Sequence, residues 1–477
     1  MTTTTAATTT AATTTAATTT LPGSFRDPAG FLFCRKGILY RQINEGYAPS
    51  YELLRSSGLY DELVNKKWLI AHDEVDKEKA LTDDAYQVIE PELLPFISYP
   101  YEWSFSQLKD AARLTLDIQE AAFAKKLSLR DASAYNVQFL EGKPVFIDTL
   151  SFEPLVEGQP WVAYRQFCQH FVAPLALMSR VDIRLGQLLR VHIDGIPLDL
   201  ASSLLPAMSK WNLSLGLHIH MHAKSQQKYA GEAVEKKHVQ RKMTSRQLLG
   251  LFDGLRQTVE KLQWKPGGTE WYDYYQANNN YGHAGLEQKE RLIAELIAEA
   301  DPKTVWDIGG NTGRFSRLAA NHGAHVVCWD IDPGCVEANY GMVSKHGEKS
   351  LLPLLLDLTN PSPGIGWNHD ERMSLRQRGP VDTLMALGLI HHLAISNNTP
   401  LPQVARFMGK SSTTLIIEFV PKSDSQVKKL LTTREDIFPD YSRAGFEVAF
   451  REVYEFIRVE EIPGTERIIY LMKKRNQ

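Results

Sequence analysis

The sequence has 477 residues, of which 43% are hydrophobic and 23% are charged, and its formal net charge is −3. The composition is typical of soluble globular proteins, and the length predicts two domains rather than one hydrophobic core. No apolar run approaches the ~20 residues of a membrane span, and the charge gives no general reason to expect a membrane or nucleic acid as partner. The four scattered cysteines have neither zinc-ligand nor disulfide spacing, so we expect a reducing, cytoplasmic environment.

The first 20 residues are threonine and alanine apart from Met1. They offer no charged, aromatic or large aliphatic side chain beyond Met1 to offset the entropy lost on ordering, so we predict a disordered tail. The segment lacks the basic start and long apolar core of a secretory signal, and it lacks the arginines of a transit peptide.

Residues 21–244 predict an α+β domain. Phe31–Gln42 has the pattern of a hairpin with Lys36-Gly37 at the turn. Tyr47–Leu63 and Ser104–Lys126 have helical periodicity.

The segment Leu129–Asp148 resembles the catalytic and metal loops of protein kinases and aminoglycoside phosphotransferases. In those families an aspartate, an asparagine five positions later and a second aspartate serve as base and metal ligands, and Asp131, Asn136 and Asp148 stand at these positions. Leu129 replaces the expected histidine, Thr149-Leu150 replaces Phe-Gly, and no glycine-rich phosphate loop precedes them. We therefore expect a degenerate kinase-like fold, or a chance match in which these side chains hold a loop together, over an active kinase.

Two further features of this domain have open interpretations. His218, His220 and His222 alternate, so in a strand they would share one face and could bind zinc, although no carboxylate or cysteine nearby completes such a site. We expect no metal here. The basic run 224–246 predicts a solvated linker, with a basic patch for RNA or an anionic substrate as the alternative.

Residues 245–477 predict a second domain that begins with the helix Thr244–Leu262. Thr304–Ile308 is a short apolar strand, the turn Asp307–Gly313 follows, and after a helix the strand His325–Trp329 ends at Asp330. A carboxylate at the end of the second strand is the usual acceptor for ribose hydroxyls in such folds. The opening unit therefore predicts a nucleotide-binding parallel sheet.

The turn has the spacing D-x-G-x-x-x-G, which resembles motif I of the class I S-adenosylmethionine (SAM) methyltransferases. The resemblance implies a seven-stranded Rossmann-like domain, SAM as cofactor, and an acidic residue, Asp307, suited to the ammonium and sulfonium of the ligand. The whole layout also resembles bacterial two-part proteins described as nodulation-type SAM-dependent methyltransferases. The resemblance assigns the cofactor to Asp307, Gly309, Gly310, Asn311, Gly313, Asp330, Ile331, Asp357, Leu358, Leu387 and Tyr281.

Three segments complete this prediction. Tyr274, Asn280 and Tyr281 stand where methyltransferases often carry a lid, or else they pack internally. The polar insertion Asn360–Arg378 predicts a loop near the active site. The strand Val381–Leu387 precedes His391 and His392, which are the candidates for a general base, or a feature that begins a helix.

The sequence thus predicts transfer of a methyl group from SAM to a small-molecule hydroxyl. The alternatives are an RNA or protein methyltransferase, a bifunctional protein with an ATP-binding kinase-like half, and a module that binds SAM without catalysis. The sequence does not define the oligomeric state.

Overall fold

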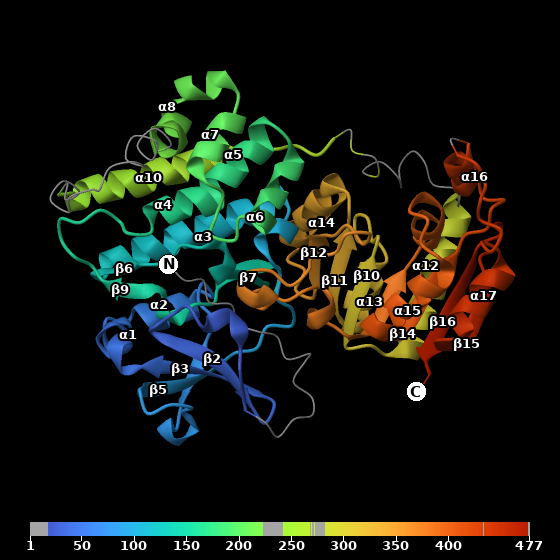
Figure 1. Cartoon of the computed structure of the whole chain (residues 1–477), viewed down its shortest axis with the longest axis horizontal. Helices are drawn as coiled ribbons and strands as arrows, with labels where there is room; N and C mark the ends of the chain where they lie inside the picture. Colours follow the sequence, from blue (N-terminus) through green and yellow to red (C-terminus); the bar gives the residue numbers. More distant parts are fainter. Residues whose placement is uncertain are drawn as a thin grey trace. The chain divides into compact units, whose positions relative to one another are not determined.

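The computed structural model describes residues 18–222, 242–267, 269, 271, 282–432 and 434–475. It divides into two compact units (Figure 1). The first contains Met1–Lys265 and Gly364–Arg372, and the second contains Pro266–Pro363 and Met373–Gln477. We expected the boundary between the two domains after residue 244. In the structure, the helix α10 (Ser245–Lys261) belongs to the first unit.

Contacts of α10 explain this difference. The Lys109 ammonium of α3 (Phe105–Ala124) donates to the carbonyls of Glu260 and Leu262, both at 2.9 Å, where α10 ends. The Phe252 ring packs edge-on against Phe123, with 5.8 Å between ring centroids. The buried face of α10 is thus part of the first hydrophobic core.

The first unit is built on a five-stranded antiparallel sheet in the order β1-β2-β3-β5-β4. The predicted hairpin forms its β2 and β3, and the predicted helix Ser104–Lys126 is α3. The predicted helix Tyr47–Leu63 is two helices, because Gly58 adopts a left-handed conformation between them. The strands are β1 (Thr19–Thr20), β2 (Gly30–Arg35), β3 (Ile38–Asn44), β4 (His72–Val75), β5 (Ala85–Pro91), β6 (Leu127–Leu129), β7 (Val137–Leu140), β8 (Lys143–Phe146) and β9 (Phe152–Pro154). The remaining α-helices are α1 (Ala48–Ser56), α2 (Leu59–Asn65), α4 (Tyr164–Phe167), α5 (Ala173–Arg180), α6 (Leu188–Val191), α7 (Leu198–Leu204) and α8 (Leu213–Leu215).

The second unit contains the predicted seven-stranded sheet, in the order β12-β11-β10-β13-β14-β16-β15. The first five strands of this order are parallel, and β16 and β15 continue the sheet antiparallel. The strands are β10 (Thr304–Ile308), β11 (His325–Asp330), β12 (Leu351–Leu355), β13 (Val381–Ala386), β14 (Ser412–Phe419), β15 (Tyr454–Glu461) and β16 (Ile468–Lys474). The α-helices are α12 (Gly282–Ala300), α13 (Ser316–His322), α14 (Pro333–His346), α15 (Leu401–Ser411), α16 (Ser425–Leu431) and α17 (Arg443–Arg451).

The histidine tract is not a strand. Gly216–His220 forms a turn of π-helix, η11, that continues to His222. Alternate side chains diverge in a helix, whereas residues four apart share a face. His218 and His222 accordingly both contact the Tyr164 hydroxyl, at 2.8 and 3.2 Å, and His220 contacts Ser202 and Ser209 instead. The geometry assumed for a zinc site was therefore wrong.

The insertion after β12 divides between the two units. Its middle part, Gly364–Arg372, belongs to the first unit rather than to a loop of the second unit. Arg26 donates to the Glu371 carboxylate at 2.9 Å, and the buried Arg372 guanidinium lies 4.5 Å from the centre of the Tyr135 ring. No helix in the described ranges is both long and apolar enough to cross a membrane.

Candidate functional site

A cavity of about 370 Å³ opens at the carboxyl ends of the parallel strands of the second unit. Its volume is in the range of small-molecule sites. Its walls include both candidate bases and every predicted cofactor residue among the described residues except Gly313. The predicted residues on the wall are Asp307, Gly309, Gly310, Asn311, Asp330, Ile331, Asp357, Leu358, Leu387, His391 and His392.

The glycine turn places backbone, not side chains, on this wall. The N–H groups of Gly309 and Gly310 donate to the Trp329 carbonyl at 2.8 and 3.0 Å, which ties the turn to β11. A Cβ on Gly310 would lie 2.5 Å from Cys328 Sγ, so only glycine fits. Gly313 adopts φ +78° and a Cβ there would meet Asn339, but it does not reach the cavity. Its backbone conformation favours glycine, and its assignment to the ligand stays a prediction.

Two buried carboxyl groups lie on the wall beside the turn. Asp330 accepts the N–H of Asn311 on one oxygen and that of Asp332 on the other, both at 2.8 Å. Asp307 accepts the Ser316 hydroxyl at 2.6 Å. Burial raises the pKa of each group to about 6, and the negative charge of Asp330 adds to the effect on Asp307. Both groups would be stabilised in their ionised form by a cationic or hydroxyl-bearing ligand.

A network of buried charges on the same wall was not predicted. The Lys289 ammonium of α12 lies 2.7 Å from Glu418 Oε2 at the end of β14, and Arg467 lies 3.5 Å from the other oxygen of Glu418. Arg467 also pairs with Asp424 at 2.7 Å. Burial lowers the pKa of Lys289, and Glu418 opposes this shift. Lys289 and Arg467 line the cavity and supply its positive side chains.

The sequence contains a signal for Lys289 that we did not use. Leu286, Ile293 and Ile297 form the buried stripe of α12, and Lys289 lies on that stripe, three residues after Leu286 and four before Ile293. A charged side chain on a buried stripe requires a buried partner or a ligand.

Trp271 fixes the start of the predicted lid segment to the glycine turn. Its N–H donates to Asp332 at 2.8 Å, and its carbonyl accepts the Asn311 side-chain amide at 2.9 Å. Its ring packs edge-on to His392, with 5.1 Å between centroids. The predicted residues Tyr274, Asn280 and Tyr281 lie outside the described residues.

His391 and His392 follow β13, where the π-helix η15 (His392–Ser396) begins, and their rings lie 4.2 Å apart. His391 is buried, and burial together with His392 holds its pKa well below the usual range. Burial also lowers the pKa of the less buried His392. Both imidazoles are therefore neutral near pH 7, the form that can accept a proton.

In the first unit, Asp131, Asn136 and Asp148 are all buried. Arg41 of β3 binds the Asp148 carboxylate at 2.6 Å, with both side chains at most 4% exposed. Burial and Asp148 raise the pKa of Asp131 to about 7. Arg41 thus already compensates the charge of the acid that the kinase resemblance would make a metal ligand. Within the described ranges, no three His, Cys, Asp or Glu side chains are placed to hold a metal.

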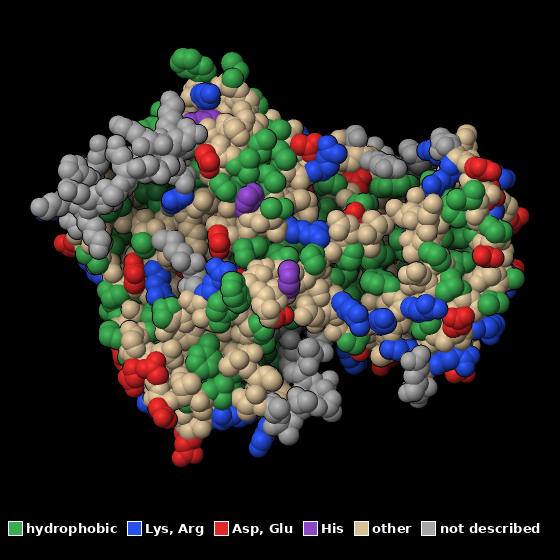
Figure 2. Space-filling view, in the orientation of Figure 1, with side chains coloured by type: hydrophobic (Ala, Val, Ile, Leu, Met, Phe, Trp, Pro, Cys, Tyr) green, Lys and Arg blue, Asp and Glu red, His purple; other side chains and the backbone are tan. Residues whose placement is uncertain are grey.

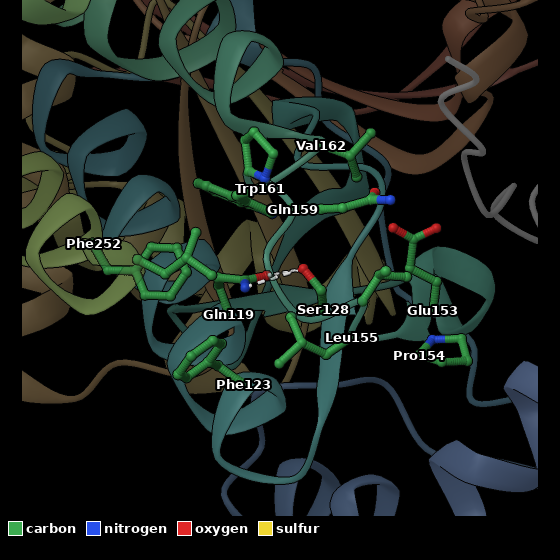
Figure 3. Close-up of a pocket in the computed structure, with 13 residues that line it drawn as sticks. Gln119, Phe123, Ser128, Glu153, Pro154, Leu155, Gln159, Trp161, Val162 and Phe252 are labelled. Carbon is green, nitrogen blue, oxygen red and sulfur yellow. Dashed lines mark hydrogen bonds between the residues drawn. The ribbon is translucent and has the colours of Figure 1, made fainter. Parts of the chain in front are cut away.

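A second cavity lies in the first unit and is far smaller, about 30 Å³ (Figure 3). Phe123 and Phe252 line it beside a hydrogen bond between Gln119 and Ser128 at 3.2 Å. Burial raises the pKa of Glu153 at its rim. It has room for about one water molecule rather than a nucleotide.

The parallel sheet, the glycine turn and the strand-end carboxylates around one cavity define a Rossmann-like class of α/β domain. No family model matches the sequence. The chain is 34% identical over 459 residues, 95% of either protein, to the nodulation protein NoeA of Rhizobium meliloti (strain 1021). It therefore belongs to the NoeA family of nodulation proteins.

Several solved methyltransferase structures are similar to less than half of the chain. The bifunctional kinase-methyltransferase WbdD matches with 14% identity over 44% of this chain and 43% of WbdD, at a TM-score of 0.30. Magnesium protoporphyrin IX methyltransferase from Synechocystis with bound SAH matches with 16% identity over 42% and 91%, at 0.30. The N-methyltransferase NodS of Bradyrhizobium japonicum matches with 9% identity over 41% and 99%, at 0.31.

We predict that Gly310→Ala destabilises the second unit by about 1–3 kcal/mol, because the new methyl group overlaps Cys328 Sγ. Chemical denaturation of the full chain measures this change. Gly341→Ala in α14 is the matched control, since a Cβ there meets nothing within 4 Å. Equal stability of the two variants would contradict the packing role of Gly310.

We predict that Arg41→Met destabilises the first unit by about 3–5 kcal/mol, because it leaves the Asp148 carboxylate buried without its ion pair. The control Lys67→Met removes an exposed pair with Glu141 and should leave the unfolding midpoint unchanged. A similar small effect for both variants would show that Asp148 does not depend on Arg41.

Proposed function

We propose that the second unit binds SAM in the 370 Å³ cavity and transfers its methyl group to a small-molecule hydroxyl. One observation carries the proposal. The glycine turn, the Asp330 carboxylate at the end of β11 and the histidine pair after β13 all line the same cavity. SAM bound at the glycine turn and Asp330 would bring its methyl group toward the histidine pair.

The residues present fit a cationic nucleoside. Asp330 would accept ribose hydroxyls, and Asp307 would pair with the ammonium group. Asp357 and Leu358, which follow β12, would contact the adenine. When bound, SAM supplies a methyl group on a positively charged sulfur, and the neutral thioether S-adenosylhomocysteine is a good leaving group.

The remaining chemistry belongs to the chain's own residues. The cavity holds the acceptor in line with the methyl group, and this positioning is the main catalytic contribution available without a metal. His392 lies on the wall and is neutral near pH 7, so it is the better placed of the two histidines to take the hydroxyl proton. His391 is the more buried and orients its neighbour.

A thermal-shift comparison of SAM, S-adenosylhomocysteine (SAH) and Mg-ATP tests the proposal, because a ligand that binds only the folded state stabilises it. We expect stabilisation by SAM and SAH but not by Mg-ATP. No shift with SAM or SAH would overturn the cofactor assignment. A shift with Mg-ATP would instead support the alternative in which the first unit binds a nucleotide.

The RNA or protein methyltransferase alternative rests on the basic run 224–246, most of which lies outside the described residues. Salt-sensitive RNA binding by the full chain would favour it. No contact among the described residues favours it over a small acceptor.

We predict that SAM affinity increases with pH through about 6. Below that pH Asp307 and Asp330 are protonated, so binding of a cation must expel protons. Calorimetry should show a loss of affinity of up to about tenfold per pH unit for each proton released. Burial lowers the pKa of both histidines of the site below the usual range. A flat profile from pH 5 to 8 would contradict a direct role for the two carboxylates.

We predict that Lys289→Gln weakens SAH binding by about tenfold or more, because the buried ammonium is placed to bind the amino-acid carboxylate of the ligand. 5′-Methylthioadenosine lacks the amino-acid part and should bind the variant and the natural chain equally. Lys303→Gln is the control, since that side chain is 80% exposed on the same unit. Equal losses for both ligands would show that Lys289 only supports the fold of the cavity.

A further inference from the structure

An exposed apolar tip projects from the first unit around α8 (Figures 1 and 2). It comprises the 3₁₀-helix η10 (Ala207–Trp211), α8 and η11. Leu213, Trp211 and Met208 are 88%, 87% and 79% exposed, more than any other large hydrophobic side chain among the described residues. Leu204 of α7, Leu217 of η11 and Met221 directly after η11 are exposed as well.

Buried polar contacts beneath the tip hold it in this conformation. The His220 ring lies 2.7 Å from the Ser202 hydroxyl of α7 and 2.9 Å from the Ser209 hydroxyl of η10. The Ser209 hydroxyl donates to the Pro206 carbonyl at 2.6 Å, and the Asn212 side chain caps α8. The apolar side chains are therefore presented by an ordered scaffold, and their exposure is not the result of a loose end.

The tip lies in a stretch of sequence without negative charge. The described residues 200–222 contain no aspartate or glutamate, and they contain Lys210. Lys210 is exposed and directly precedes Trp211. The surroundings of the apolar side chains thus favour an anionic partner.

We propose that this tip is an interfacial anchor that docks the protein on the surface of an anionic lipid bilayer. Side chains exposed by nearly nine-tenths project from the surface, so a protein partner would need a matching hollow, whereas a bilayer admits them without one. Tryptophan favours the boundary between headgroups and acyl chains, and lysine beside it favours anionic headgroups. The anchor lies at the membrane surface and does not span it.

Vesicle flotation of the full chain tests the anchor. We expect binding to phosphatidylcholine vesicles that contain about a third phosphatidylglycerol, weaker binding at high salt, and little binding to pure phosphatidylcholine. The double variant Trp211→Ser/Leu213→Ser should lose about tenfold or more of the binding. Trp367→Ser removes another exposed tryptophan and should bind as the natural chain does.

Circular dichroism and thermal unfolding confirm that each variant is folded. Neither these controls nor the flotation test depends on whether the second unit binds SAM. Trp211 fluorescence should shift to shorter wavelength on binding anionic vesicles. Equal flotation of the natural chain and the double variant would overturn the proposal, as would equal binding to neutral and anionic vesicles. The proposal would also be overturned if the natural chain did not bind vesicles and the double variant changed its oligomeric state. That result would assign the tip to contact between copies of the chain.

Discussion

The second unit depends on the burial of two carboxyl groups, Asp307 and Asp330, at the ends of neighbouring strands. Removing a carboxylate from water is costly, and the raised pKa of each group measures that cost. The fold reduces it with three donors, namely the Ser316 hydroxyl and the N–H groups of Asn311 and Asp332. The glycine turn exists in this form because the chain must bring those donors to the carboxylates without a Cβ in the space of Cys328.

This constraint explains why the opening of the second unit could be predicted from the sequence. The strands, turn and carboxylates lie within thirty residues of one another, and their order alone fixes which ends of the parallel strands meet. The seven-stranded sheet was expected from the resemblance to the methyltransferases. Its parallel strands are compact apolar runs, whereas β15 alternates exposed charged side chains with less exposed ones. Gly313 was assigned to the ligand because the motif includes it, and that assignment stays a prediction; a Cβ at this position would meet Asn339.

Contacts between distant residues could not be predicted in this way. Lys289 and Glu418 are separated by 129 positions, and nothing in either local segment specifies the other. The prediction for the histidine tract was wrong for a different reason. Histidines at alternate positions share one face only if the chain is extended there. The helical conformation redirects His220 to two serines and leaves His218 and His222 on one tyrosine.

The first unit shows how a familiar spacing of residues can have a different physical role. Asp148 stands where the kinase pattern would place a metal ligand, but Arg41 supplies the positive charge from within the chain. The negative charges of Asp27 and Asp148 are balanced by Arg41 and Arg130 inside the unit, so the cluster holds together without an ion from solution.

The segment Gly364–Arg372 bears on whether either unit can be considered alone. The chain leaves the second unit after Pro363, contributes the Glu371 and Arg372 side chains to the interior of the first, and returns at Met373. Arg372 is 1% exposed beside Tyr135, so a first unit cut from the chain at Lys265 would lack a buried cation that covers that ring. Arg26 would likewise lose the carboxylate it binds. The two units are therefore distinct in their cores but not independent in sequence, and the whole chain is the unit of folding to which measurements of stability refer.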